Sequence, residues 1–324
     1  MKRLRNFKWK DSTVKAISLS FLFLSTQVAS YEGDIHQRLT FMAAKQLSLC
    51  DQASGDGVMS ALDTRYIVRA NVAQAESNVF VRMFRWNYYN RDGGREKAAL
   101  GIIDTRFHAH FNSLASDLAK LYKSEERYKT LGKLLNYIQD VTSPSKVVPV
   151  FTNRWWRLSF YDRFDRFPID VTWMEKSLLE SCAEIQNFLQ SSASKPIEQI
   201  FQSILQETAE KTIEKVREPI AGLPADWTYF WEFGETDEFG NYGPAGNKFG
   251  ERTAFDCGAN QKCLLLDKDP ICRDFANQLH FNSIVATMKA IRILHGVSIT
   301  AVSYTHPDAA DERSSVDLGG RRII

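Results

Sequence analysis

Two short segments of the chain carry the side chains that are best suited to chemistry. The first runs from Tyr31 to His36 and reads YEGDIH, and the second runs from Leu131 to Asp140 and reads LGKLLNYIQD. Imidazole nitrogen and carboxylate oxygen are ligands that zinc prefers, and the two segments contain both. In the second segment Asn136 and Asp140 are four residues apart, so on a helix their side chains share one face.

The second segment also has a plain structural interpretation. The face with Asn136 and Asp140 lies opposite an apolar stripe that includes Leu131 and Ile138, and Pro144 stops the helix. A solvated helix face that ends at a proline has the same pattern. Taken alone, the segment favours this interpretation, and a functional one needs support from other parts of the chain.

The elements that would position these segments are predicted to be mainly helices. Apolar residues recur at three- and four-residue steps in Gln37–Leu49, Thr64–Phe84, Lys97–Tyr122, Glu126–Val141, Trp173–Leu189, Ile197–Val216 and Asp274–Leu294. Between Gly222 and Asp269 this period fails, and Gly, Asn and aromatic residues predict a long irregular region with short strands. We therefore predict one mainly α-helical domain over residues 31–301.

Residues 1–30 have the pattern of a secretory signal peptide. Basic residues crowd the first ten positions, a short apolar run covers Ala16–Leu24, and small side chains follow up to Ser30. Cleavage after Ser30 would make Tyr31 the new N-terminus and would export the protein to the periplasm or the medium. The alternative is an uncleaved signal anchor. No other stretch is apolar enough to predict a transmembrane span.

Residues 302–324 are interpreted as a tail that is not native to the protein. A strongly helical pattern stops abruptly before them, and neither a helix period nor a strand period replaces it. For this reason we assign no function to His306 or Asp308, although both residue types could do chemistry.

The net charge gives a further indication of the class of protein. The 41 Lys and Arg residues nearly balance the 39 Asp and Glu residues, for a net charge of +2. The excess lies in the predicted signal peptide, so the domain itself is slightly acidic and bulk charge gives no support for nucleic-acid binding.

Cys257, Cys263 and Cys272 lie close together in a polar stretch, which predicts a loop-closing disulfide in an exported chain. With five Cys residues, at least one thiol stays free.

Taken together, the two segments resemble the superfamily of zinc-dependent phospholipases C and zinc-dependent single-strand nucleases of the P-one type. In that family the mature chain begins with Trp and a His follows five residues later, which is the spacing of Tyr31 and His36. The central helix of the family reads Leu-Gly-x-x-x-His-x-x-x-Asp and is followed by Pro-x-His. The matching residues here are Leu131, Gly132, Asn136, Asp140, Pro144 and Lys146.

Three further parts of the family pattern have counterparts in the chain. The segment Asn87-Tyr88-Tyr89-Asn90 stands where the family has a His-Phe-Tyr-Asn-like segment. Tyr161 and Asp165 stand where it has His-x-x-x-Asp, and Glu76 is the nearest counterpart of an acidic ligand upstream. The resemblance covers the chain from Tyr31 to about Asp165.

The resemblance implies a helix-lined centre in which zinc ions activate a water molecule to hydrolyse a phosphodiester. The family has three such ions. Carried over to this chain, it implies that the Tyr31 α-amino group, His36 and Asp140 are metal ligands, with Asp140 as the residue on which catalysis depends. Glu76 would be an additional carboxylate ligand.

The chain departs from the family at four positions that hold His there. Asn87, Asn136, Lys146 and Tyr161 occupy these positions here. A protonated Lys cannot bind a metal and repels one nearby, so the site that would combine Lys146, Tyr161 and Asp165 is predicted to be lost. We therefore expect one zinc ion rather than three. Calcium or magnesium is the alternative, since both accept carboxylate and amide oxygens.

These observations predict an exported protein of the phospholipase C/zinc nuclease fold, with metal-dependent phosphodiester hydrolysis as its activity and a reduced metal site. Lys146, Asn136 and Asn87 are candidates for binding the phosphate of a lipid headgroup or a nucleotide. The alternative is a non-catalytic binding or interaction protein that reuses the same fold. For Lys146 alone, the alternative is a solvated side chain just past a helix end. A third interpretation is an unrelated helical protein with chance matches.

Overall fold

A computed structural model of the chain describes residues 31, 33–54, 59–77, 81, 84–91, 103–151, 161–235, 239–258 and 261–305. The predicted signal peptide and the part of the predicted tail after residue 305 lie outside the described residues. Helices dominate the described chain, which confirms the mainly α-helical class.

The α-helices are α2 (Gly33–Ser54), α3 (Ala61–Ala75), α5 (Phe107–Lys120), α6 (Ser124–Asp140), α7 (Pro144–Val147), α8 (Val171–Ser177), α9 (Ser181–Ser192), α10 (Ile197–Arg217) and α11 (Pro270–Thr305). Single 3₁₀ turns are η2 (Phe164–Arg166), η3 (Leu178–Glu180) and η4 (Trp227–Tyr229). The strands are β1 (Trp231–Glu232), β2 (Asn241–Tyr242), β3 (Thr253–Asp256) and β4 (Lys262–Leu265).

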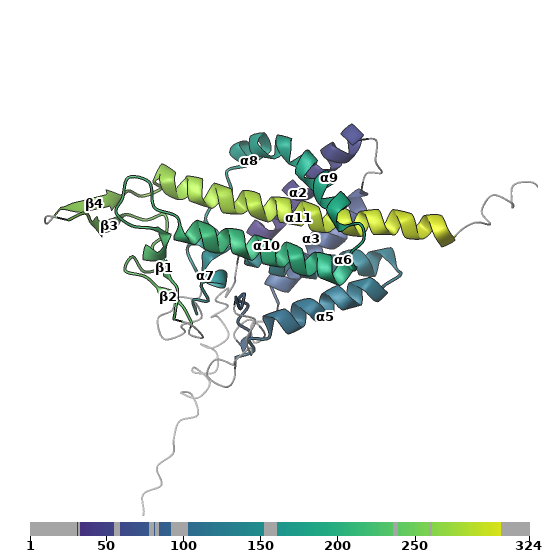
Figure 1. The fold of residues 1–324 in the computed structure, drawn as a ribbon, viewed down its shortest axis with the longest axis horizontal. Helices are drawn as coiled ribbons and strands as arrows, with labels where there is room; N and C mark the ends of the chain where they lie inside the picture. The colour runs from purple at the N-terminus through teal and green to yellow at the C-terminus, as the bar shows by residue number, and fades with distance from the viewer. Residues whose placement is uncertain are drawn as a thin grey trace, which may run out of the picture.

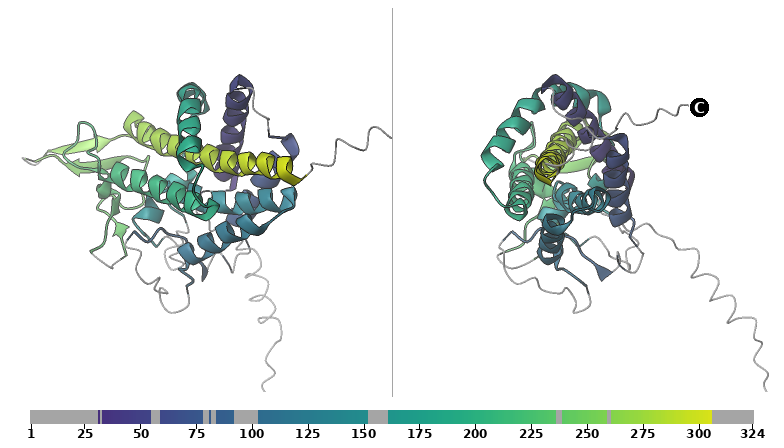
Figure 2. Two further views of the ribbon diagram at one scale, coloured as in Figure 1. Left: turned by 45° about the vertical axis from the view of Figure 1, so that its right-hand side comes forward. Right: turned by 90° about the vertical axis from the view of Figure 1, so that its right-hand side faces the viewer.

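The longest helix, α11, runs through the bundle beside α10, and both strand pairs lie at its N-terminal end (Figure 1). When the bundle is viewed almost along α11, the other helices surround it (right-hand view of Figure 2). Helix α6 packs against α3, α5 and α11, while α2 packs against α3 and α11. The bundle therefore encloses the second half of α6 on several sides at once.

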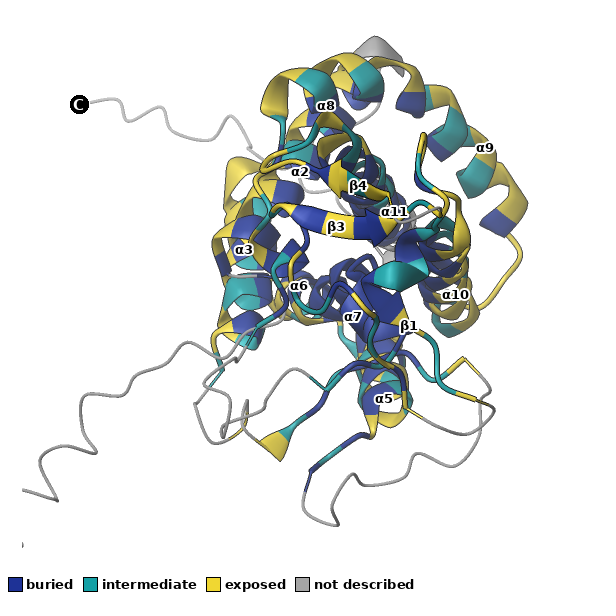
Figure 3. Ribbon diagram, turned by 90° about the vertical axis from the view of Figure 1, so that its left-hand side faces the viewer, coloured by how far each residue is buried: buried dark blue, intermediate teal, exposed yellow. Residues whose placement is uncertain are grey.

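The last two turns of α6, residues 134–140, are buried on every face, polar residues included (Figure 3). Close approach of α3 is one reason. A Cβ atom at Gly132 would lie 2.3 Å from the carbonyl oxygen of Ile67 on α3, so only glycine fits where the two helices cross. The prediction that the Asn136 and Asp140 face of this helix is solvated is therefore wrong.

The region from Gly222 to Asp269 is irregular with short strands, as its composition predicts. Strand β1 pairs with β2, and β3 pairs with β4, both antiparallel. In the second pair Thr253 lies opposite Leu265 and Asp256 lies opposite Lys262. These two hairpins cover one end of the helical bundle rather than forming a layer of their own.

Several predicted helix boundaries are wrong. Helix α3 ends at Ala75 rather than continuing to residue 84, and α5 begins at Phe107 rather than at residue 97. The stretch predicted as one helix from Trp173 to Leu189 is broken at η3, where the Ser181 hydroxyl donates to the Leu178 carbonyl at 2.7 Å. Such local side-chain bonds compete with the helix ladder and are not visible to a pattern of apolar residues. Helix α11 continues to Thr305, past the predicted domain end at Ala301.

Two disulfides join parts of the described chain. Cys257 is bonded to Cys263 across the β3–β4 turn, and Cys50 on α2 is bonded to Cys182 on α9. Cys272 is a buried free thiol. The predicted loop-closing bond and the predicted free thiol are thus both present, whereas the link from α2 to α9 was not predicted. Among the described residues, no helix is both long and apolar enough to cross a bilayer.

The Cys50–Cys182 bond is expected to be the main covalent contribution to stability. It joins residues 132 apart, whereas the Cys257–Cys263 bond joins residues 6 apart. Replacing both Cys50 and Cys182 by Ser should lower the free energy of unfolding by about 2–5 kcal/mol, measured by urea denaturation. The matched variant, Cys257→Ser with Cys263→Ser, removes a bond that closes a much shorter loop. Its free energy of unfolding should therefore fall by roughly 2–3 kcal/mol less. An equal loss in the two variants would contradict this account.

Candidate functional site

The C-terminal turn of α6 places three polar side chains inside the bundle. Asn136, Gln139 and Asp140 are all at most 1% exposed. Side chains from three other helices meet them there, namely His36 and Thr40 from α2, Asn71 from α3 and Thr287 from α11. The site is therefore a buried polar cluster at the point where α2, α3, α6 and α11 converge.

Gln139 organises this cluster and fixes the orientation of His36. Its amide nitrogen donates to the hydroxyls of Thr40 and Thr287 at 3.0 and 3.1 Å. Its oxygen is therefore an acceptor, and His36 Nδ1 lies 2.7 Å from it. An Nδ1 atom that faces this acceptor carries a proton, so in the neutral form of His36 the lone pair lies on Nε2. His residues that bind metals usually have this arrangement: one ring nitrogen donates a hydrogen bond to an acceptor, and the other binds the metal through its lone pair.

The lone pair of His36 faces α6. Asn136 Nδ2 lies 3.2 Å from His36 Nε2, and Asp140 Oδ1 lies 3.4 Å from the same atom. Asn136 also donates to the Asn71 side-chain oxygen at 3.3 Å. The predicted ligands His36 and Asp140 are therefore adjacent, with Asn136 beside them.

Asp140 is the least satisfied group in the cluster. Its side chain is wholly buried, and neither carboxylate oxygen has a hydrogen-bond partner within the described structure. A buried carboxylate without partners is costly, because transfer out of water removes its hydration and nothing replaces it. A cation bound at this carboxylate would offset that cost.

Tyr31 completes the predicted set. Its ring is wholly buried and packs edge-on against His36, with the ring centroids 5.6 Å apart. Its hydroxyl lies 3.2 Å from the Thr142 hydroxyl just after α6. Burial raises the pKa of the Tyr31 phenol well above its usual value, and the carboxylates of Asp165 and Asp140 add to the shift. The structure thus places the Tyr31 ring beside the His36 and Asp140 pair.

Glu76 lies away from this group. It follows the last residue of α3 and is exposed. Its carboxylate packs against the first turn of α2, where a Cβ atom at Gly33 would lie 2.5 Å from Glu76 Oε1. Glu76 also lines a groove on the surface between α2 and α3. The structure does not place it beside Asp140.

Lys146 belongs to a second, neighbouring cluster. It lies on α7, is only 5% exposed, and acts electrostatically on Asp162 and Asp165. Burial raises the pKa of Asp165 to about 8, and the Lys146 ammonium opposes that rise. Ser143 donates to Asp165 Oδ1 at 2.6 Å. The interpretation of Lys146 as a solvated side chain is therefore wrong, since its charge is held inside the protein beside carboxylates.

The two remaining predicted residues are Asn87 and Tyr161. Asn87 is half-buried, and its segment is bonded to α7 through the Tyr89 amide, which donates to the Lys146 carbonyl at 2.8 Å. Tyr161 turns outward, where the Arg166 guanidinium stacks on its ring at 3.5 Å. Because Asp165 points inward to Ser143, Tyr161 and Asp165 do not share a site.

Some members of the cluster carry no signal in the sequence. Gln139, Asn71 and Thr287 are ordinary polar residues within helical patterns. His280 on α11 is wholly buried, and neither ring nitrogen has a hydrogen-bond partner among the described residues. Its ring packs against Tyr31 and Phe164, with centroids 5.9 and 5.7 Å away. A lone His in an apolar helix could be found from sequence only as an interruption of that apolar face.

No family model, curated protein or solved structure matches the chain. Within the described ranges, no group of three or more His, Cys, Asp and Glu side chains is arranged to hold a metal ion. His36 and Asp140 are a pair, and any further ligand must be of another kind, such as an amide oxygen or an α-amino group.

Burial lowers the pKa of His280 to about 3, and this shift should make the fold acid-sensitive. In the unfolded chain the His280 side chain becomes protonated near pH 6.5, whereas in the folded chain it stays neutral down to about pH 3. Stability should therefore fall as the pH drops through this window, by up to about 1.4 kcal/mol per pH unit. His280→Leu should remove this component and stay folded at pH 7, since no hydrogen bond is lost.

Urea denaturation between pH 7 and pH 4 measures the effect. The control is His110→Gln, because His110 is half-buried and lies 2.9 Å from Asp104 rather than in the core. That variant should keep the acid sensitivity that His280 causes. If His280→Leu loses stability on acidification as steeply as the parent, His280 is not the cause.

Proposed function

We propose that this protein is an exported metal-dependent phosphoric-ester hydrolase, a reduced relative of the zinc phospholipases C and single-strand nucleases. One divalent ion would be held by His36 Nε2, the Asp140 carboxylate and the α-amino group of Tyr31 after signal cleavage. The observation that carries the proposal is the pair of wholly buried ligands, 3.4 Å apart, with both Asp140 oxygens unpartnered.

The separation of this pair suits a shared zinc ion. Nitrogen and oxygen ligands lie about 2.0–2.2 Å from zinc in a tetrahedral site, which sets two such ligands roughly 3.3–3.6 Å apart. His36 Nε2 and Asp140 Oδ1 meet this requirement at 3.4 Å. The proton on Nδ1, held by Gln139, gives the ring the tautomer that a metal ligand needs.

The residues of the chain have distinct roles in this proposal. Gln139 orients the His36 ring, and Tyr31 packs against that ring on the other side. A divalent ion held here would polarise a phosphoryl oxygen and lower the pKa of a bound water toward neutrality. Zinc is preferred because of the imidazole, and calcium or magnesium would rely on the oxygens of Asp140 and Asn136.

Two observations support a single ion rather than three. Lys146 is buried and its charge acts on Asp162 and Asp165, so a side-chain ammonium already lies near these carboxyl groups. Tyr161 points away from Asp165 and stacks under Arg166. The family positions for further ions are therefore occupied by a cation or turned out of the site.

Export is supported by the pattern of residues 1–30 and by two disulfides. Disulfides form and persist in the periplasm and outside the cell and are rare in the cytosol. Export would also create the third ligand of this proposal, because removal of residues 1–30 would leave an α-amino group on the buried residue Tyr31.

The second candidate is a non-catalytic binding protein built on the same fold. It is favoured by the Asn136 amide, which donates to the lone pair of His36, and by the complete burial of Asp140. In that case the cluster would be a hydrogen-bonded core that fixes the packing of four helices. Lys146, Asn136 and Asn87 would then be residues of a lost catalytic centre.

Metal content and hydrolysis distinguish the two candidates. The chain starting at Tyr31 should bind about one divalent ion and hydrolyse bis(p-nitrophenyl) phosphate when zinc, manganese or calcium is supplied. Asp140→Asn should reduce the metal content at least tenfold and abolish hydrolysis, because it removes the charged ligand. The control is Asp274→Asn, an exposed carboxylate on α11 that should leave both values unchanged. Less than about one-tenth of an ion per chain, with no hydrolysis in any metal, would refute the hydrolase and favour the binding protein.

A further inference from the structure

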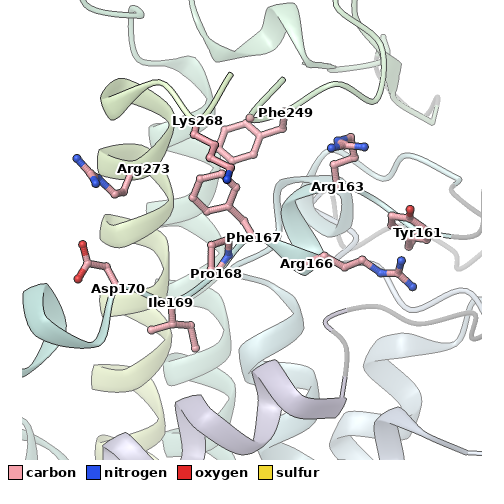
Figure 4. A pocket seen from close by; sticks show the side chains of 11 residues that line it. Tyr161, Arg163, Arg166, Phe167, Pro168, Ile169, Asp170, Phe249, Lys268 and Arg273 are labelled. Carbon is pink, nitrogen blue, oxygen red and sulfur yellow. The ribbon is translucent and has the colours of Figure 1, made fainter. Parts of the chain in front are cut away.

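A second candidate site lies on the outer side of η2. A pocket of about 470 Å³ opens between this turn, the Phe249-Gly250 segment and the start of α11. Four cations line it, namely Arg163 and Arg166 from η2 and its flank, Lys268 from the loop after β4, and Arg273 from α11. Figure 4 shows Phe167 and Phe249 in the middle of this pocket with Lys268 beside their rings, Arg273 on one side, and Arg163 and Arg166 on the other.

The charges of this pocket are only partly neutralised by the protein. Asp170 is the one acidic residue among its lining, and its Oδ1 already accepts the Trp173 amide at the start of α8. Arg163 pairs through one terminal nitrogen with Glu251 at 2.9 Å, but its Nε is buried without a hydrogen-bond partner. Within the described part of the chain, neither Lys268 nor Arg273 forms an ion pair.

The start of α11 strengthens the positive potential. Its first turn has no acidic residue, yet Arg273 lies there. The partial positive charge at the amino end of α11 is met by Asp269, which precedes the helix and accepts the Ile271 amide at 3.1 Å, so the cation that this end adds to the pocket is Arg273. Arg273 and Lys268, which form no ion pair within the described residues, therefore favour an anion in this part of the pocket.

The centre of the pocket is aromatic. The rings of Phe167 and Phe249 pack edge to face, with their centroids 5.1 Å apart. Gly250 has a φ of +77°, and a Cβ atom there would lie 2.8 Å from the Phe167 ring. Glycine at position 250 therefore lets the Phe167 ring contact the backbone beside the cations. A ligand that fits must combine an anionic group with an apolar, preferably flat, part.

We propose that this pocket binds a phosphate monoester whose organic part lies on Phe167 and Phe249 while its phosphate contacts Lys268 and Arg273. A phosphate monoester is nearly dianionic at neutral pH and offers three oxygens, which matches several cations better than a carboxylate does. The pocket is separate from the buried cluster, because η2 points Asp165 inward and Arg163 and Arg166 outward. The inference is independent of any metal bound at Asp140.

The test uses isothermal titration calorimetry on the full chain in the presence of a chelator, so that a metal site cannot contribute. Phenyl phosphate should bind more tightly than inorganic phosphate, and phenol should show no binding. The affinity should weaken as salt is raised, because the contacts are between charges near the surface. Equal affinity for phenyl phosphate and inorganic phosphate would refute the role of the aromatic rings.

A pair of substitutions locates the site. Lys268→Gln with Arg273→Gln should weaken phenyl phosphate binding about tenfold. Both side chains are exposed, so the variant should keep the thermal midpoint of the parent. The matched control is Lys262→Gln, an exposed cation at the start of β4 that does not line the pocket. No binding by the parent, or unchanged affinity in the double variant, would overturn the proposal.

The two sources of such a ligand are separated by further probes in the same assay. Tighter binding of adenosine 5′-monophosphate than of dihexanoyl phosphatidic acid would assign the pocket to soluble nucleotides. The reverse order would assign it to the headgroups of lipids. Either order supports a phosphate monoester site, whereas binding of neither probe would overturn it.

Discussion

The carboxylate of Asp140 is the group around which the buried cluster is organised. It has been moved out of water without a hydrogen bond to either oxygen, which a protein normally avoids. Its neighbours satisfy one another instead, because Gln139 bonds His36, Asn71, Thr40 and Thr287. A polar network that is complete except for one charge is costly as a purely structural device, and the same geometry suits a bound cation.

The surrounding frame explains how such a charge can stay buried. Gly132 lets α3 approach α6, and α11 covers the opposite side of the cluster with Thr287 and the ring of His280. The disulfide from Cys50 to Cys182 joins α2 to α9 at the edge of the hydrophobic core, where Cys50 is buried. Separate helices thus fix the His36 and Asp140 side chains, so the pair is held by packing as well as by its own hydrogen bonds.

Sequence patterns predicted the helical class and the irregular region after Gly222, whereas the grouping of Tyr31, His36 and Asp140 came from the family resemblance. They failed for the environment of α6, because Asn136 and Asp140 form a polar face that is typical of solvent exposure. Only the packing of α3 and α11 shows that this face is buried. The basic pocket was missed for a related reason, since its cations come from segments about a hundred residues apart. Local periodicity describes one helix at a time and carries no information about which helices meet.

The central claim is that His36 and Asp140 hold a divalent ion in the mature chain. A crystal structure of the chain starting at Tyr31, grown with zinc, would test it through anomalous scattering at the zinc absorption edge. The account predicts an anomalous peak about 2.0–2.2 Å from both His36 Nε2 and an Asp140 oxygen. A map without a peak at this position, with His36 still bonded to Asn136, would contradict it and leave the cluster as a structural core.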